Sequence, residues 1–290
     1  MKTGDVIVIK FGGGLITKKD SFCTPLTQRI SALASVVKRC IDSGFRVVVV
    51  HGAGSYGHIR SRYWRLKDGV LPNCAFKSQK DCSTQEQAVT LVRQEMLELN
   101  RVVCDALKDV GVQARVHPPH RWVVGTGIHF QGDVKERFLN HSADKEVDVT
   151  FGDVVPEKDP KKRFSILSGD DLVVRLSLEL PNVTRLIFAI GGADGLLKKP
   201  PSHGGGLQDL IRLYTPRTAV SMVHNSKIDV TGGIGLKIDR GVHVSKVSKG
   251  SVDVFLVNGE YPDRVLSACL GLVKANFVGT RICGHFQGHL

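Results

Sequence analysis

Two glycine-rich stretches of the sequence combine the residue types that bind phosphate. Three glycines at 12–14 follow Lys10 and Phe11, and residues 52–58 read Gly-Ala-Gly-Ser-Tyr-Gly-His. Because glycine has no Cβ, backbone N–H groups in such loops can approach an anion closely. A lysine at the first loop and a histidine at the second add charge and hydrogen bonds, since imidazole titrates near neutral pH. The two stretches predict a site for a phosphorylated ligand.

Each stretch must be positioned by the apolar segment that precedes it. Residues 47–50 are four valines, the pattern of a strand buried on both faces, and residues 6–10 form a shorter apolar strand. Between them, Thr24 and Pro25 fit the N-cap and first position of a helix, and Gly44 fits its C-terminal end. Strand, loop, helix and strand form a βαβ unit, so we expect parallel strands with a right-handed crossover.

The longest periodic segment runs from Thr84 to Val110. Thr84 and Gln87 fit a capping box, and apolar residues recur every three or four positions, which predicts an amphipathic helix. Its main apolar stripe would pack on the sheet, and the width of the apolar surface also allows a helix-mediated homodimer. The residues of the second apolar side are Leu91, Leu97, Val102 and Leu107.

The second half of the chain repeats the pattern of a strand followed by a loop. A strand at 147–151 precedes Gly152, and a strand at 185–190 precedes another glycine-rich loop. Residues 115–163 are otherwise irregular, and 156–162 are the best candidate for an interdomain hairpin or linker. Because ligands of open α/β sheets bind beyond the carboxyl ends of the strands, we expect these loops to converge on one crevice.

Two further helices are expected in the C-terminal half. Ser168 can cap a helix whose first turn holds Asp170 and Asp171, and the helix dipole alone would favour acids there. A second helix at 234–247 carries Lys237.

Composition narrows the class of protein. With 290 residues, of which 42% are apolar, the chain can bury a sizeable core, but no apolar run approaches the roughly 20 residues of a membrane helix. No signal peptide is evident, and the seven scattered cysteines form no C-x-x-C pair, so we expect reduced thiols in the cytoplasm. The net charge of +12 suits acidic ligands, whereas 6% aromatic residues and no basic stripe disfavour nucleic acid.

Residues 52–57 also match G-x-G-x-x-G, the dinucleotide-binding fingerprint. That fingerprint needs a second strand ending in an acid about 20 residues further on, to hold the ribose. Residues 60–73 are instead rich in arginine and lysine. The loop also follows a second strand, whereas the fingerprint normally opens the first βα unit. We therefore do not interpret the match as a dinucleotide site.

The ordered set of motifs resembles that of the amino acid kinase superfamily, and most closely that of the isopentenyl phosphate kinases. That family carries K-L-G-G-S with a lysine five residues after the serine, then V-H-G-G-G-x-F-G-H, G-D, I-S-G-D-D, D-V-T-G-G-M-x-x-K-I, N-G and G-T. The chain carries counterparts in the same order over nearly its whole length. They lie at 10–14 with Lys19, and at 50–58, 152–153, 167–171, 229–237, 258–259 and 279–280.

The resemblance implies a three-layer αβα sandwich with a mainly parallel central sheet, and transfer of a phosphoryl group from ATP to a small monophosphate. It implies that Lys10 stabilises the transferring phosphoryl group and that Lys19 contacts phosphate from the other side. Lys237 matches the lysine on the nucleotide's terminal phosphates, and Asp171 the acid that holds such lysines in place. His58 matches the histidine that hydrogen-bonds the acceptor phosphate.

Binding residues follow from the same resemblance, with Mg²⁺ carried on the nucleotide phosphates and no metal ligands among the side chains. Gly54 and Gly152 would supply backbone N–H groups. The nucleotide set is Gly12, Gly13, Gly191, Asp194, Gly195, Gly233 and Lys237. The acceptor set is Gly54, Ser55, Gly57, His58 and Gly152.

The chain departs from the family pattern at several positions. Gly14 stands where the family has serine, Lys18 where it has an acid, and Ala53 where it has glycine. Residues 191–192 are Gly-Gly where the family has Thr-Asp, in a loop that helps to hold the nucleotide, and this change bears on nucleotide affinity and identity. Gly235 replaces a frequent basic or polar residue.

We expect an acceptor domain at 1–160 and an ATP-binding domain at 161–290, in a cytoplasmic homodimer without membrane or nucleic-acid partners. The predicted reaction converts isopentenyl phosphate and ATP to isopentenyl diphosphate and ADP, a step of isoprenoid biosynthesis by the mevalonate pathway. Two alternatives stay open. One is a related kinase for another small monophosphate or phosphonate, of the fosfomycin-kinase type. The other is a catalytically weak descendant that binds a nucleotide or RNA.

Overall fold

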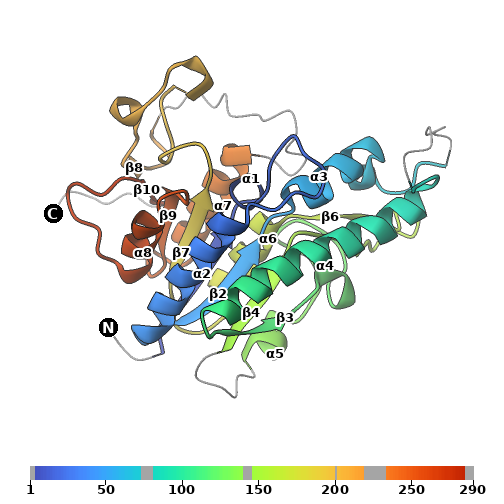
Figure 1. The fold of residues 1–290 in the computed structure, drawn as a ribbon, viewed down its shortest axis with the longest axis horizontal. Helices are drawn as coiled ribbons and strands as arrows, with labels where there is room; N and C mark the ends of the chain where they lie inside the picture. The colour runs from blue at the N-terminus through green and yellow to red at the C-terminus, as the bar shows by residue number, and fades with distance from the viewer. Residues whose placement is uncertain (1–3, 73–80, 140–145, 200, 219–232, 285–290) are drawn as a thin grey trace.

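A computed structural model describes residues 4–72, 81–139, 146–199, 201–218 and 233–284. Within these ranges the chain forms an eight-stranded sheet, a separate two-stranded hairpin, and helices on both faces of the sheet (Figure 1). The predicted three-layer αβα sandwich with a mainly parallel sheet is confirmed. None of the helices in these ranges is long and apolar enough to cross a bilayer.

The central sheet carries its strands in the order β3-β4-β2-β1-β7-β9-β10-β8. The strands from β3 to β9 in this order are parallel, whereas β10 is antiparallel to β9 and parallel to β8. The predicted parallel pairing of the first two strands is therefore confirmed. The strands are β1 Val6–Phe11, β2 Arg46–His51, β3 Gln113–Val116, β4 Glu146–Phe151, β7 Val183–Ile190, β8 Leu213–Tyr214, β9 Asp253–Asn258 and β10 Thr280–Ile282.

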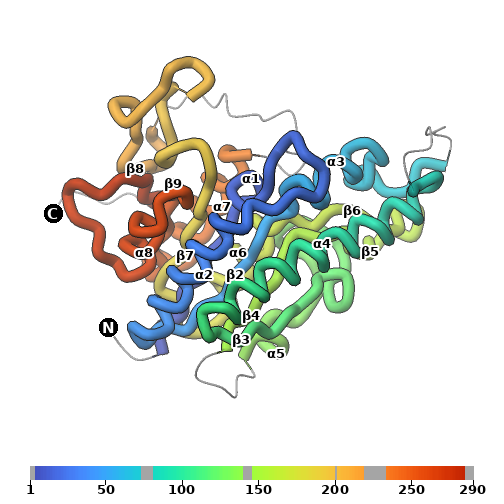
Figure 2. Tube along the Cα trace, viewed as in Figure 1, coloured from blue at the N-terminus to red at the C-terminus, as the bar shows by residue number. Residues whose placement is uncertain are grey.

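Helices cover both faces of the sheet (Figure 1). On one face lie α2 (Thr27–Asp42), α4 (Gln85–Asp109) and α8 (Pro262–Leu270), and on the other α5 (Val134–Leu139), α6 (Gly169–Glu179) and α7 (Gly233–Val247). The trace in Figure 2 shows α4 beside α2 and reaching α3 (Gly54–Tyr63). The remaining helices are α1 Gly13–Ile16, η1 Leu66–Asp68, η2 Pro119–Arg121, η3 Pro201–His203 and η4 Leu207–Asp209.

The strands of the centre are apolar throughout because both of their faces are covered. Val47 and Val49 pack into the core beneath α2 and α4, while Val48 and Val50 pack into the core beneath α6. All four valines are buried, as the uninterrupted apolar run predicts.

One predicted helix start needs correction, and one predicted capping box forms only in part. Helix α2 begins at Thr27 with Leu26 as its N-cap, not at Thr24 and Pro25. Pro25 instead forms a β-bridge with Thr17, which closes the loop between α1 and α2. In α4, Thr84 Oγ1 accepts from the N–H of Gln87 at 3.2 Å, as predicted. The reciprocal bond of the capping box is shifted by one residue, because Gln87 Oε1 accepts from the N–H of Ser83.

Residues 156–162 belong to a hairpin. They connect β5 (Asp153–Pro156) to β6 (Phe164–Leu167), which pair with each other in antiparallel fashion. The sheet itself is continuous across the two halves of the chain, because β1 pairs with both β2 and β7. The irregular region around this hairpin also contains β3 and the short helix α5, which had not been predicted.

Candidate functional site

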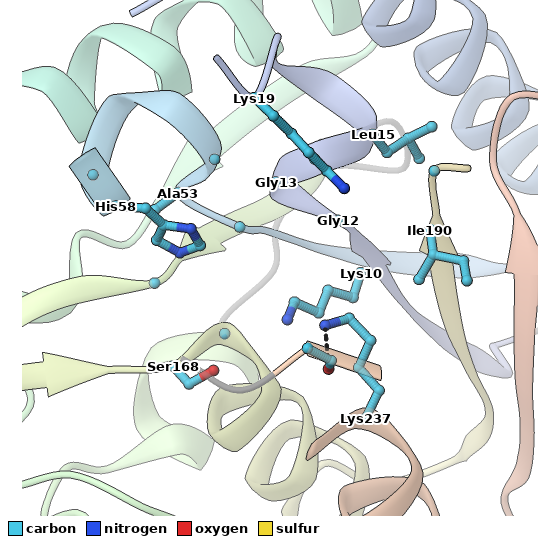
Figure 3. A pocket seen from close by; sticks show the side chains of 18 of the residues that line it. Lys10, Gly12, Gly13, Leu15, Lys19, Ala53, His58, Ser168, Ile190 and Lys237 are labelled. Atoms are coloured by element: carbon cyan, nitrogen blue, oxygen red, sulfur yellow. Dashed lines mark hydrogen bonds between the residues drawn. The ribbon is translucent and has the colours of Figure 1, made fainter. Parts of the chain in front are cut away.

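A cavity of about 460 Å³ lies at the carboxyl ends of β2, β1 and β7. The glycine-rich loops after these strands line it, together with the starts of α6 and α7, so the predicted convergence is confirmed. Figure 3 shows Lys19 and His58 approaching the cavity from two different sides, with Lys10 and Lys237 close together across from them.

One buried carboxylate holds two of the lysines that line this cavity. Asp170 accepts hydrogen bonds from Lys10 Nζ and, at 3.3 Å, from Lys237 Nζ. Lys10 is 4% exposed and Asp170 is 1% exposed. Burial by itself would raise the pKa of Asp170, but the attraction of the two ammonium groups outweighs it and the pKa lies below its ordinary 3.8. Asp170 therefore stays ionised and keeps both cations in place.

The prediction that Asp171 holds the lysines is wrong, because Asp170 accepts their hydrogen bonds. One residue along a helix is a rotation of about 100°, and this rotation turns Asp171 away from the cavity toward α7. There its Oδ1 lies 2.7 Å from Nη2 of Arg240. Burial raises the pKa of Asp171, and the pairing with Arg240 offsets only part of that rise. The pair joins α6 to α7.

Arg240 was not singled out from the sequence, although a signal for it exists. It lies three residues after Lys237 on the same helix, so the two side chains share one face of α7. Two adjacent acids on α6 therefore meet two cations one turn apart on α7. This double pairing fixes the position of Lys237 relative to Asp170.

The loop that carries Lys19 is anchored by Ser55. The N–H of Ser55 donates to Thr17 Oγ1 at 2.9 Å, its Oγ accepts from the N–H of Thr24 at 3.3 Å, and its carbonyl oxygen accepts from the N–H of Cys23 at 3.5 Å. Ser55 is 1% exposed and lies outside the cavity wall. The structure thus gives Ser55 an anchoring role in place of the predicted contact with the acceptor.

His58 lies within the first turns of α3, half-buried, and faces the cavity (Figure 3). Gly57 beside it serves packing: a Cβ there would lie 2.7 Å from Cβ of Ala53 and 3.3 Å from Sδ of Met96. Glycine at this position lets α3, the helix that carries His58, lie close to α4. The role of Gly57 is therefore structural, although it also borders the cavity.

Other loop glycines let backbone segments touch each other. A Cβ on Gly13 would lie 2.3 Å from the N atom of Gly54, and one on Gly52 would lie 2.6 Å from the N atom of Gly13. The loops after β1 and β2 are thus packed directly together. Gly152 donates its N–H to the carbonyl of His51 at 3.1 Å, which conflicts with its predicted use as a donor to the acceptor.

The loop after β7 is held by the two short motifs near the C-terminus. Asp194 accepts hydrogen bonds from Asn258 Nδ2 at 3.1 Å and from Arg264. Thr280 Oγ1 accepts from the N–H of Leu196 at 2.8 Å. Asp194 therefore supports this loop and does not line the cavity, and the same is true of Gly195. Residues 191–193 of the loop do line it.

The remaining predicted positions divide as follows. The motif residues 229–232 lie outside the described part of the chain, and Gly233 begins α7, where its carbonyl accepts from Lys237 Nζ at 3.1 Å. The predicted residues that line the cavity are Lys10, Gly12, Gly13, Lys19, Gly54, Gly57, His58, Gly152, Gly191, Gly233 and Lys237. Those that do not are Ser55, Asp171, Asp194 and Gly195.

One group of apolar side chains lines the cavity near Gly57, beside which Met96 lies. These side chains come from α4 and from the β5–β6 hairpin, which lie far apart in sequence. Met96 and Val92 are buried members of the long stripe of α4. This group consists of Val92, Met96, Val154, Ile166 and Leu167, and further apolar residues of the cavity wall are Leu15, Ile190, Ala193 and Ile234.

Comparison with known proteins agrees with this geometry. Residues 5–258 match the model of the amino acid kinase family. The chain is 27% identical to the isopentenyl phosphate kinase of Methanothermobacter thermautotrophicus over 96% of this chain and 99% of that protein. It is 31% identical to the isopentenyl phosphate kinase of Haloferax volcanii over 80% of this chain and 86% of that protein. A solved X-ray structure of isopentenyl phosphate kinase superposes with a TM-score of 0.73 and 25% identity, over 96% of this chain and 99% of that one. The chain therefore belongs to the amino acid kinase family, and the relatives named here are isopentenyl phosphate kinases.

Proposed function

We propose that this protein transfers the γ-phosphoryl group of ATP to isopentenyl phosphate, giving isopentenyl diphosphate and ADP. The observation that carries the proposal is that the wall of one cavity is divided between lysine side chains and a group of apolar side chains from α4 and the β5–β6 hairpin, with His58 also on the wall. A monophosphate with a short hydrocarbon tail likewise combines a charged part, which lysines can bind, with an apolar part. The isopentenyl phosphate kinases among the relatives support the assignment.

Phosphoryl transfer needs positioning and neutralisation of charge more than a covalent catalyst. Lys10 is the best-placed cation for the transferring group, because its buried ammonium acts in a site where water screens little. Lys237 would bind the terminal phosphates of the nucleotide from α7, and Lys19 would contact phosphate from the opposite side (Figure 3). In this arrangement His58 donates a hydrogen bond to the acceptor phosphate.

In this proposal the two halves of the chain bind different substrates. Residues 1–160 supply the loop with His58 and the apolar side chains of α4, which would hold the acceptor. Residues 161–290 supply the loop at 191–193 and Lys237, which would hold ATP. Mg²⁺ bound to the nucleotide would supply further charge neutralisation. The phosphates would carry it, because the oxygens of Asp170 are already engaged by two lysines.

The proposal extends to assembly and location. Leu91, Leu97 and Val102 form a partly buried apolar side on α4, which suits a homodimer through this helix. Analytical ultracentrifugation of the wild type and of a Leu97→Lys variant tests it, and a monomeric wild type would exclude the dimer. The free cysteines of the described residues fit the reducing cytoplasm.

The decisive experiment is turnover of a panel of acceptors with ATP and Mg²⁺. The panel contains isopentenyl phosphate, a short-chain alkyl phosphate, a polar sugar phosphate and fosfomycin, and ³¹P NMR detects the diphosphate product. We expect the highest kcat/KM with isopentenyl phosphate. Preference for the phosphonate would favour the alternative kinase, and no turnover of any member would overturn the proposal in favour of a binding protein.

The variant His58→Asn tests binding of the acceptor separately from binding of the nucleotide. We expect it to raise the KM for isopentenyl phosphate and lower kcat/KM by roughly 10- to 100-fold, the effect of one lost hydrogen bond to a charged group. The Kd for ATP, measured by calorimetry, should stay unchanged. A weakened Kd for ATP would mean that His58 lies on the nucleotide side.

A further inference from the structure

The side chain of Lys19 lies across Gly14, at a distance that leaves no room for a Cβ. A Cβ built on Gly14 would be 2.7 Å from Cε of Lys19, and 3.8 Å from both Cδ and Cγ. The first distance is shorter than non-bonded carbon atoms adopt. Lys19 can therefore extend into the cavity along this path only because residue 14 has no side chain.

The backbone beneath Lys19 cannot readily move to relieve such a contact. Its loop is closed by the bridge between Thr17 and Pro25, and the N–H of Lys18 donates to the carbonyl of Thr24 at 2.9 Å. The three hydrogen bonds with Ser55 described above join the same loop to α3. The position of the Lys19 backbone is thus fixed relative to the cavity.

The backbone of Gly14 is fixed as well. Gly14 lies within α1, whose carbonyl at Gly13 accepts from the hydroxyl of Thr17 at 2.9 Å. On its other side α1 packs against the loop after β7, because a Cβ on Gly191 would lie only 3.2 Å from the carbonyl oxygen of Gly14. With both backbones held, a side chain at position 14 would have to displace the end of the Lys19 side chain.

We propose that Gly14 is a positioning residue that lets Lys19 place its ammonium group at the bound phosphates. This inference rests on the proposed phosphotransferase function, in which Lys19 contacts phosphate. The identity of residue 14 thereby sets how far this lysine reaches into the cavity.

Gly14→Ala should keep the stability of the protein and lose part of its activity. The φ angle of Gly14 lies outside the positive range that favours glycine, and alanine has the higher helix propensity. The variant should therefore fold with a melting temperature no lower than that of the wild type. It should nevertheless lose activity, because the new Cβ displaces Cε of Lys19.

A double-mutant cycle of Gly14→Ala and Lys19→Ala measures the coupling, with Lys18→Ala as the control for the neighbouring exposed lysine. Lys19→Ala should lower kcat/KM by roughly 10- to 100-fold, the loss of one charged hydrogen bond. Gly14→Ala should lower kcat/KM by roughly 3- to 30-fold alone and by less than about 2-fold in the Lys19→Ala background. Lys18→Ala should match the wild type. Full additivity of the two changes, or an active Gly14→Ala enzyme, would overturn the inference.

A measurement without turnover separates this inference from the function it rests on. Crystal structures of the wild type and of Gly14→Ala should show Cε of Lys19 over residue 14 in the first and displaced from it in the second. If the wild type phosphorylates no acceptor but this displacement occurs, the proposed function fails while the positioning by Gly14 stands. An unchanged Lys19 in the variant would refute the positioning whatever the activity.

Discussion

Replacing Asp170 by asparagine would leave Lys10 and Lys237 in a buried site without their shared counter-charge. The change keeps the shape of the side chain and removes only its charge. Lys237 Nζ lies 3.3 Å from the carboxylate, a separation at which two unit charges attract by about 5 kcal/mol at an effective dielectric constant of about 20. Lys10 adds a second attraction of the same kind. Part of this gain is offset in the wild type by the cost of burying the charges.

Removal of one partner from a buried ion pair usually costs about 3–5 kcal/mol. We therefore expect Asp170→Asn to lower the free energy of unfolding by about this amount in the absence of ligand. ATP brings its own negative charge to the two lysines, so its binding should restore about 1–2 kcal/mol more stability to the variant than to the wild type. The variant would thus be a less stable protein that depends more strongly on its ligand.

Urea denaturation with and without saturating ATP measures both quantities. Asp171→Asn is the matched control, since it makes the same change one residue away at a carboxylate paired with the half-exposed Arg240. The control should show a smaller loss of stability and no additional stabilisation by ATP. A loss below about 1 kcal/mol in Asp170→Asn, or the same ATP effect in both variants, would refute the reasoning.

Three further predictions follow from the same residues. The pKa of Asp170 lies below its ordinary 3.8. The ionised carboxylate therefore contributes its full stabilisation above pH 3.8, and this contribution is lost as the pH falls further. The difference in unfolding free energy between the wild type and Asp170→Asn should stay constant from about pH 7 to about pH 4 and shrink below about pH 4. Lys10→Ala should mainly lower kcat and leave the KM values nearly unchanged in steady-state assays, since its contact strengthens in the transition state. Gly57→Ala should lower the free energy of unfolding by about 1–3 kcal/mol, because the new Cβ meets Ala53 and Met96. The same variant should raise the KM for the acceptor, and an unchanged KM would show that the position of His58 does not depend on this packing.

Much of the fold was predictable because local sequence and sheet geometry agree. The four valines of β2 can be buried on both faces only inside a sheet with two covered sides, and parallel strands then bring their following loops to one edge. Lys10 and His58 were singled out because they border the loops after β1 and β2, whereas the role of Lys237 came from the resemblance to the amino acid kinase superfamily. The strand β3 and helix α5 were missed because they are short and lack a clear hydrophobic period.

The roles of individual loop residues were harder to predict, because the same residue type serves binding and packing. Gly57 looks like a phosphate-loop glycine until Met96, distant in sequence, is seen beside it. Ser55 looks like a ligand contact, but its polar atoms are used to hold the Lys19 loop. Asp170 and Asp171 are adjacent acids in the first turn of α6, and the rotation of α6 about its axis decides which of them faces the lysines. That rotation depends on packing that the local sequence does not predict.

The pairing of β1 with β2 on one side and β7 on the other has a consequence for the path of the reaction. Neighbouring strands lie about 4.8 Å apart, so the loops that start from β2 and β7 leave the sheet about 10 Å from each other. That span suits an acceptor phosphate and the last two phosphates of a nucleotide set end to end. Lys10, one residue before the end of the strand between them, would lie opposite the middle of such a line. Hydrogen-bonded ladders resist stretching, so the gap across which the phosphoryl group moves would be set when the chain folds, and ligand binding would have little left to adjust.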